Sequence, residues 1–280
     1  MDYPFPVFLA VLGAATLHAA WNALVRGGTD PLLHTAAIVL WTGVYAIPVV
    51  LLLPLPAPES WSYLFWGVVV HIGYYFTLAG AYREGTLSVI YPIIRGCAPL
   101  LVSIGSLIFL SENLTTQAWV GVILVSLGVL VIALRSGMTR PRHGIAWALA
   151  CSATIATYSI IDGQGARVSN SPIAFAGWLY ITESIVFGAI LVGLGKRTDL
   201  VNYIRVRLKS TAIGGLMSAL GFGIVLWAMT HAPIAAVSAT RESSVLFAVV
   251  LGVWLLKEKL KPRQWLAALG ILSGLIFLRL

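Results

Sequence analysis

The sequence predicts an all-α membrane protein with ten transmembrane helices, arranged as two inverted five-helix repeats around a central cavity. Three observations support this fold class. Hydrophobic residues make up 59% of the 280 residues and charged residues only 10%, with a mean hydropathy of +0.92, whereas soluble domains are about 45–50% apolar. The apolar runs have the length of membrane spans, since a helix needs about 20 residues to cross the bilayer core. The two halves of the chain also share a spaced set of residues.

The predicted spans are residues 5–25, 32–54, 61–82, 87–110, 114–134, 145–164, 172–195, 209–230, 233–256 and 263–279. Prolines such as Pro31, Pro141, Pro172 and Pro262 mark the junctions, where a missing backbone N–H costs least. The first apolar run lacks the basic segment of a signal peptide, so we expect it to stay as a helix. Ten spans use nearly the whole length, and we expect no soluble domain.

Basic residues fall mainly on one side of the predicted bundle. Fourteen of the 18 Lys and Arg residues follow the odd-numbered spans, whereas the other side carries Arg167 and Arg279. Because basic loops are retained in the cytoplasm, we expect both termini outside, in the periplasm of a bacterial inner-membrane protein. The net charge of +8 therefore reflects topology, and we expect no nucleic-acid partner.

A repeat of about 146 residues relates the two halves. The matched pairs are Arg95 and Arg241, Glu112 and Glu258, Leu114 and Leu260, Trp119 and Trp265, and Gly128 and Gly274. Five helices per repeat is an odd number, so the second copy enters the membrane from the opposite face. Inverted repeats are typical of alternating-access carriers with a site near the midplane. The repeat therefore predicts secondary transport of a small solute.

Four short segments carry a resemblance to a known family. They are His18-Ala19-Ala20-Trp21-Asn22-Ala23, residues 81–99, Ser111-Glu112-Asn113-Leu114 and Lys257-Glu258-Lys259-Leu260. On these segments the chain resembles the ten-helix, EamA-type members of the drug/metabolite transporter superfamily. The resemblance implies two EamA-like repeats, at 1–137 and 138–280, and export of amino acids or related metabolites, including aromatic amino acids. Unlike many relatives, this chain lacks a basic amino terminus, so its orientation is taken from the loop charges.

Two arginines lie inside predicted spans. Arg95 and Arg241 each lie about nine residues into a span, roughly 13 Å at 1.5 Å per residue. An ionisable residue at that depth costs about 2.5–3.5 kcal/mol on insertion scales and needs a partner or a wet cavity. Two interpretations stay open. The arginines bind a substrate carboxylate or form gating pairs with Glu183 and Glu242, or each one ties two helices together.

The third span carries a stripe of rings. His71, Tyr74, Tyr75, Leu78 and Tyr82 are spaced i, i+3, i+4, i+7 and i+11, which places them on one helix face. Tyrosine and histidine combine a flat apolar face with a hydrogen-bonding edge, as a cavity for an amphipathic solute requires. The alternative is an aromatic belt at the membrane boundary, which suits Tyr82.

Other polar residues repeat the same spacing. His18 and Asn22 are separated by four positions in the first span, as are Tyr158 and Asp162 in the sixth. The candidate substrate-binding or cavity residues are His18, Trp21, Asn22, His71, Tyr74, Tyr75, Leu78, Tyr91, Arg95, Tyr158, Trp178, Glu183, Arg241 and Ser244. Glu183 and Asp162 are the candidates for proton coupling, although Asp162 has the alternative of solvation near a helix end.

The remaining function classes find little support in the sequence. An intramembrane lipid-modifying enzyme is the alternative of another class, but no HExxH, GxSxG or Walker motif occurs. Cys97 and Cys151 lie in apolar runs without a metal-binding pattern, so we expect no catalytic residue, metal or cofactor. Two arginines and an aromatic interior favour amino acids, aromatic or large and apolar, with drug-like cations or phosphorylated metabolites as alternatives. We expect a monomer in the bilayer whose partner is its solute.

Overall fold

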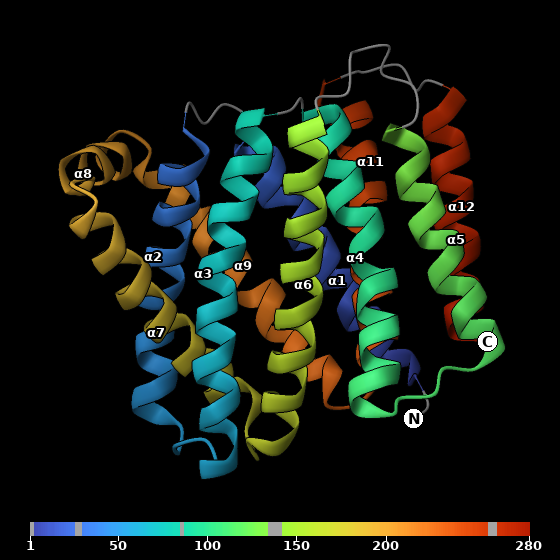
Figure 1. Cartoon of the computed structure of the whole chain (residues 1–280), viewed down its shortest axis with the longest axis horizontal. Helices are drawn as coiled ribbons and strands as arrows, with labels where there is room; N and C mark the ends of the chain where they lie inside the picture. The colour runs from blue at the N-terminus through green and yellow to red at the C-terminus, as the bar shows by residue number, and fades with distance from the viewer. Residues whose placement is uncertain (1–2, 26–29, 85–86, 134–141, 257–261) are drawn as a thin grey trace.

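The computed structural model describes residues 3–25, 30–84, 87–133, 142–256 and 262–280, and its regular elements there are all helical. The helices are α1 (Phe5–Val25), α2 (Pro31–Leu52), the 3₁₀ turn η1 (Pro58–Ser60), α3 (Trp61–Glu84), α4 (Leu87–Leu110), α5 (Thr116–Ala133), α6 (Arg142–Val168), α7 (Pro172–Gly193), α8 (Arg197–Val206), α9 (Leu208–Met229), α10 (Ile234–Arg241), α11 (Ser244–Leu256) and α12 (Pro262–Arg279) (Figure 1).

The predicted all-helical class is confirmed. Six helices are long and apolar enough to cross a membrane, namely α2, α3, α4, α6, α7 and α9, and shorter apolar helices lie within α1, α5 and α12. Two features depart from the predicted spans. The ninth span is broken into α10 and α11, and the short helix α8 lies between the seventh and eighth. Ten membrane crossings in two inverted repeats remain a prediction.

Two helices begin with the same capping device. Asp30 precedes Pro31 at the start of α2, and its side chain accepts hydrogen bonds from the backbone N–H groups of Leu32 and Leu33 at 2.9 and 3.1 Å. Ser171 precedes Pro172 at the start of α7 and accepts from a backbone N–H two residues into that helix. A polar N-cap satisfies the free donors, and proline fits the first helical position.

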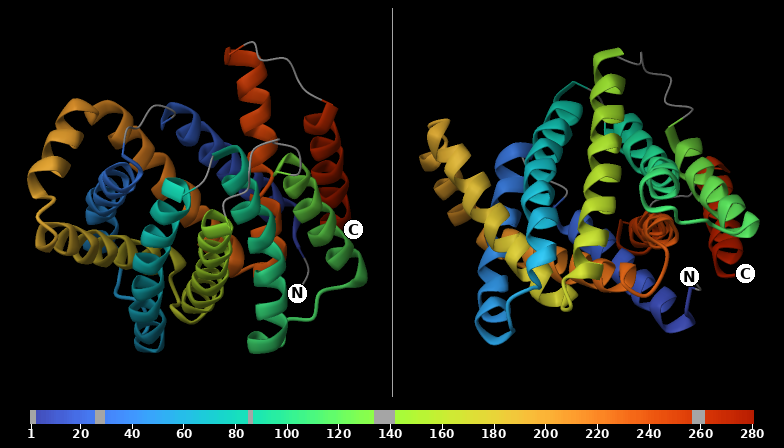
Figure 2. Two further views of the ribbon diagram at one scale, coloured as in Figure 1. Left: turned by 45° about the horizontal axis from the view of Figure 1, so that its top comes forward. Right: turned by 60° about the horizontal axis from the view of Figure 1, so that its bottom comes forward.

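The first and second halves of the chain are interleaved. α1 packs on α9, α2 on α7, α3 on α6 and α5 on α12, so each of these pairs joins one half to the other. In Figures 1 and 2 both termini lie at the lower end of the bundle, and α8 lies at the upper end. "Upper end" and "lower end" are used below in this sense. A space between the pairs is therefore bounded by both halves.

Helices α5 and α12 approach each other unusually closely through glycines. A Cβ atom built on Gly274 would lie 2.7 Å from the carbonyl oxygen of Gly121 and 2.8 Å from the backbone nitrogen of Val125. These neighbours are backbone atoms of the other helix, so a side chain has nowhere to go. Small residues that allow such contact are typical of helix pairs in membranes.

The break between α10 and α11 is a short stretch of tighter helix. The N–H groups of Glu242 and Ser243 donate to the carbonyl groups of Ala239 and Thr240, at 3.1 and 3.0 Å. These are i to i+3 bonds, which mark a 3₁₀ turn within a longer helix. Arg241 and Glu242 lie at this turn and are both buried, so the break places two opposite charges inside the bundle.

Candidate functional site

A central cavity lies between the two halves of the chain. It holds about 980 Å³ of empty space, counting its open mouth, and side chains from eight helices line it. Nine predicted residues are among them: His18, His71, Tyr74, Tyr75, Leu78, Arg95, Tyr158, Glu183 and Arg241. Their roles in binding remain predictions. The part of this space that can hold the centre of a water-sized sphere is about 150 Å³, smaller than the common 300–1,000 Å³ of ligand sites.

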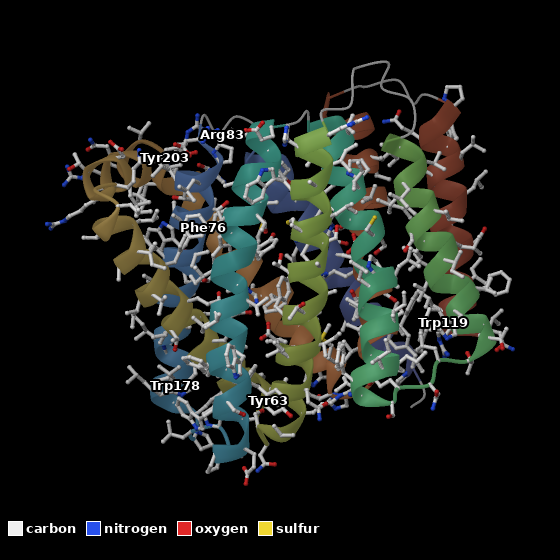
Figure 3. The ribbon with its side chains drawn as sticks, in the orientation of Figure 1. Tyr63, Phe76, Arg83, Trp119, Trp178 and Tyr203 are labelled. Carbon is white, nitrogen blue, oxygen red and sulfur yellow. The ribbon has the colours of Figure 1, made fainter. Side chains whose placement is uncertain are left out.

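The cavity reaches from the middle of the bundle toward the upper end. His34 and Thr35, in the first turn of α2, line it. Nδ1 of His34 lies 2.9 Å from the hydroxyl of Tyr203 on α8, and Figure 3 shows Tyr203 at the upper end. Partial burial raises the pKa of Tyr203 above its ordinary value, which keeps this hydroxyl neutral. The surface helix is thus tied to the mouth of the cavity.

Aromatic rings form one wall of the cavity. The rings of His71 and Tyr158 are 4.1 Å apart between centroids, with a tilt of 34°. Phe222 on α9 meets both rings edge-on, at 5.7 and 6.0 Å, and Tyr74 lies 5.5 Å from Tyr158. Offset and edge-to-face arrangements of this kind are the favourable ones. The wall therefore offers flat apolar faces to a planar solute.

His71 lies between two carboxylates. Its Nε2 is 2.7 Å from Oδ2 of Asp162, and its Nδ1 is 3.1 Å from Oε1 of Glu183. The hydroxyl of Tyr75 donates to Oε2 of Glu183 at 2.9 Å. All four residues are buried, and Asp162 is 0% exposed. The possible solvation of Asp162 near a helix end is therefore wrong, because α6 continues past it to Val168 and places it against α3.

Arg95 forms the pair that the sequence left open. Its Nε lies 2.8 Å from Oε2 of Glu242, and its Nη2 donates to the hydroxyl of Ser244 at 3.1 Å. The pair joins α4 of the first half to the α10/α11 break of the second. Arg95 is 6% exposed and Glu242 is 0% exposed, so the charges neutralise each other inside the protein. Ser244 does not line the cavity and serves this pair instead.

Arg241 has a different environment, although it precedes Glu242. It lines the cavity, and its side chain hydrogen-bonds the hydroxyl of Tyr158. Its Nε and Nη2 are buried and have no hydrogen-bond partner within the described part of the chain. These two nitrogens share one edge of the guanidinium plane, which can donate two parallel hydrogen bonds to a carboxylate. Arg241 therefore presents an open anion-binding edge inside the cavity.

Four other predicted residues lie elsewhere or outside the described residues. Trp178 packs on Trp61, with centroids 5.5 Å apart, and Figure 3 shows it near the lower end, away from the cavity mouth. Tyr91 packs against the apolar core and hydrogen-bonds Ser244. The side chains of Trp21 and Asn22 lie outside the described residues. Trp178 fits an aromatic belt at a membrane boundary better than a cavity.

Sequence reasoning missed several lining residues. They include His34, Thr42, Tyr180, Ser218 and Phe222. Tyr180 carried a usable signal, since it lies three positions before Glu183 on α7 and shares its face. Phe222 carried none, because an apolar residue in an apolar span is equally compatible with the core or the lipid. The contribution of α9 to the cavity depends on the three-dimensional packing.

The lower end of the bundle is fastened by an ion pair. Nη2 of Arg167 lies 2.6 Å from Oε1 of Glu112, and Arg167 also donates to the carbonyl groups of Met229 and Ala232 at 2.8 and 3.0 Å. The other oxygen of Glu112 accepts from the N–H of Ile234 at 3.1 Å. Glu112 therefore caps the amino end of α10. The pair joins the α4/α5 and α9/α10 connections to the end of α6.

We expect Arg167→Gln to open the lower end. Removing roughly 1.4 kcal/mol from a closed state shifts a two-state equilibrium about tenfold. The measurement is labelling of Ser218→Cys in the cavity by an impermeant maleimide, in a background without Cys97 and Cys151, from the side of the termini. The rate should rise about tenfold with Arg167→Gln and stay unchanged with Arg83→Gln, whose exposed pair lies at the upper end. Equal labelling rates in the two variants would show that the pair of Arg167 and Glu112 does not hold the lower end closed.

Comparison with known proteins gives three findings. Residues 142–280 match the EamA-like transporter family. A stretch of 130 residues is 26% identical to the riboflavin transporter of Brucella anthropi, covering 46% of this chain and 44% of that protein, so the match spans less than half of that relative. A solved crystal structure shares the fold, with a TM-score of 0.68 and 18% identity over 97% of this chain and 94% of that one.

Proposed function

We propose, from the match of residues 142–280 to the EamA-like transporter family, that the protein exports small amphipathic solutes. Aromatic or large apolar amino acids are the leading candidates. A membrane-embedded small-molecule transporter accounts for the apolar helices and for a cavity bounded by both halves. Alternating access would expose that cavity to each side of the membrane in turn.

The observation that carries the substrate class is the open edge of Arg241. Two buried donors without partners cost about 1–3 kcal/mol each, and a carboxylate from the solute would satisfy both at once. Tyr158, which hydrogen-bonds Arg241, stacks on His71 in the aromatic wall. An anionic group on Arg241 would therefore lie beside rings that accept an aromatic or apolar side chain.

The orientation of the bundle supports export. The cavity reaches toward the upper end, where α8 carries the basic residues Arg197 and Arg205, and the termini lie at the lower end (Figure 2). Basic loops are retained in the cytoplasm. With the upper end placed there, in a bacterial inner membrane with periplasmic termini, the cavity is open to solute from the cell interior and closed below by Glu112 and Arg167.

A flavin-like planar solute is the second candidate. The riboflavin transporter of Brucella anthropi matches 46% of this chain, and the aromatic wall would suit a flat heteroaromatic ring. Such a solute has carbonyl groups but no carboxylate. Its carbonyl groups could accept hydrogen bonds from Arg241, but the opposite charge that a carboxylate adds would be missing.

Replacing Arg241 separates the two candidates. We expect Arg241→Gln to raise the KM for aromatic amino acids about ten- to hundredfold, because a charged hydrogen bond is worth about 1.5–3 kcal/mol. The measurement is counterflow of labelled phenylalanine, tryptophan and riboflavin in proteoliposomes of the purified protein. Phenylalaninamide, which lacks the carboxylate, should compete weakly with the wild-type protein.

Arg241→Lys is the matched variant, since it keeps the charge and loses the two-nitrogen edge. An intermediate KM is expected for it. Equal competition by phenylalanine and its amide would contradict the carboxylate site, and flux of riboflavin alone would favour the second candidate. Recovery of the solute chemically unchanged after counterflow distinguishes a carrier from an enzyme.

A further inference from the structure

We propose that His71, Asp162 and Glu183 form a proton-binding site that drives solute export by exchange, one proton entering as one solute leaves. The inference rests on the proposed function and deepens it. The ligand of this site is the proton, and the ammonium group of a zwitterionic solute competes with the proton for it. The three residues come from α3, α6 and α7.

The geometry around His71 favours a dissociable proton. A neutral imidazole has one N–H and can donate to only one carboxylate. Here both nitrogens lie within 3.1 Å of a carboxylate oxygen. Nε2 forms a hydrogen bond with Asp162, whereas Oε1 of Glu183 has no hydrogen-bond partner among the described residues. A second proton, on the imidazole or on Glu183, makes the Nδ1 contact attractive. If that proton leaves, a nitrogen lone pair faces an anionic oxygen, which is repulsive.

The balance of charges around the cavity also indicates one bound proton. Arg95 and Glu242 neutralise each other. Arg241 then remains as one cation beside the two carboxylates Asp162 and Glu183, so the group has one excess negative charge when the imidazole is neutral. Buried charge is stable only when it is compensated. One bound proton makes this group neutral.

The site is in contact with the cavity. His71 and Glu183 line it, whereas Asp162 lies behind them at 0% exposure. Tyr74, Tyr75 and Tyr158 are the other titratable groups facing His71, and Arg241 is the nearby cation. A water molecule that enters the cavity can therefore protonate the imidazole nitrogen. It can also remove that proton, and the electron pair of the broken N–H bond then stays on the nitrogen.

Solute and proton compete for the same carboxylate. A zwitterion with its carboxylate on Arg241 has its ammonium group in the same cavity as Glu183. In the cavity without solute the proton supplies the positive charge next to Glu183; the ammonium group would occupy the same place, and a protonated imidazole would repel it. Tyr158 connects the two sites, because it stacks on His71 and bonds Arg241. Mutual exclusion of this kind is the requirement for exchange.

The test compares counterflow, which needs binding and access, with accumulation driven by a pH gradient, which also needs coupling. For one-to-one exchange, a difference of about one pH unit corresponds to about tenfold accumulation of phenylalanine. We expect both His71→Gln and Asp162→Asn to lose the gradient-driven accumulation, and Asp162→Asn, whose side chain is fully buried behind the cavity wall, to retain counterflow within about threefold of wild type. Thr157→Val, on an exposed position of α6, is the control that should retain both.

The outcomes separate this inference from the proposed function. Wild-type protein without counterflow of any amino acid overturns the proposed function, and accumulation that persists in both variants overturns the proton site. A measurement without solute tests the proton site even if the variants lose all solute flux. Infrared difference spectra across a pH titration in bilayers should show a titrating signal that both His71→Gln and Asp162→Asn lose, and an unchanged signal overturns the inference even where the variants lose all flux.

Discussion

Replacing Arg95 with methionine is expected to lower the free energy of unfolding by about 3–5 kcal/mol, the usual cost of leaving one charge of a buried pair without its partner. Glu242 is fully buried at the α10/α11 break, and Arg95 lies 2.8 Å from it. Methionine approximates the length of the arginine stem, so the loss would come mainly from the charge. The measurement is unfolding in mixed micelles by added denaturing detergent.

The double variant Arg95→Met with Glu242→Gln provides the control. It removes both charges, and we expect it to recover at least half of the lost stability, because no charge is then left buried without its partner. A double variant as unstable as Arg95→Met would show that the charge pair contributes little. The stability would then depend on the packing of the guanidinium stem against its neighbours.

Gly274→Ala is expected to be the most damaging methyl group that can be added to the described helices α5 and α12. Its Cβ would lie 2.7 Å from a backbone oxygen and 2.8 Å from a backbone nitrogen of α5, and neither atom moves without separating the helices. Overpacking costs about 1–3 kcal/mol, and we expect the upper part of that range. The same detergent unfolding measures it.

Gly73→Ala is the matched substitution. A Cβ atom at Gly73, inside α3, meets no atom within 4 Å, so only helix propensity changes, which favours alanine by about 0.5–1 kcal/mol. The two variants add the same methyl group to a helix and should change stability in opposite directions. Equal effects would mean that the α5/α12 contact is looser than the structure shows.

The sequence predicted the features that depend on short-range pattern. Span lengths follow from runs of apolar residues, and the stripe His71, Tyr74, Tyr75 and Leu78 follows from helical period, so the helices and one wall of the cavity were accessible. The helix break at Glu242 was not predicted, although the adjacent Ser243 and Ser244 are weak helix formers and offered a local signal. What distinguishes the break is a charge partner on α4.

Pairing of buried charges was the least predictable part. Asp162 and His71 are 91 positions apart, and no local pattern selects that contact from the other acid and base combinations. The predicted repeat pairs Arg95 with Arg241, yet the two arginines differ in environment. One is neutralised by Glu242, and the other keeps two donors open. Identical residues in matched positions can thus diverge through a single neighbour.

The division between α10 and α11 also constrains how the chain is assembled during synthesis. The two helices have 8 and 13 residues, and each is too short to cross a layer that takes about 20. As the predicted ninth span, they would leave the translocon as one segment with Arg241 and Glu242 near its middle, at an insertion cost of about 2.5–3.5 kcal/mol for each charge. Arg95, made earlier on the ribosome, would by then be in the bilayer to receive Glu242. We therefore expect biogenesis of the carboxy-terminal half to depend on prior insertion of α4.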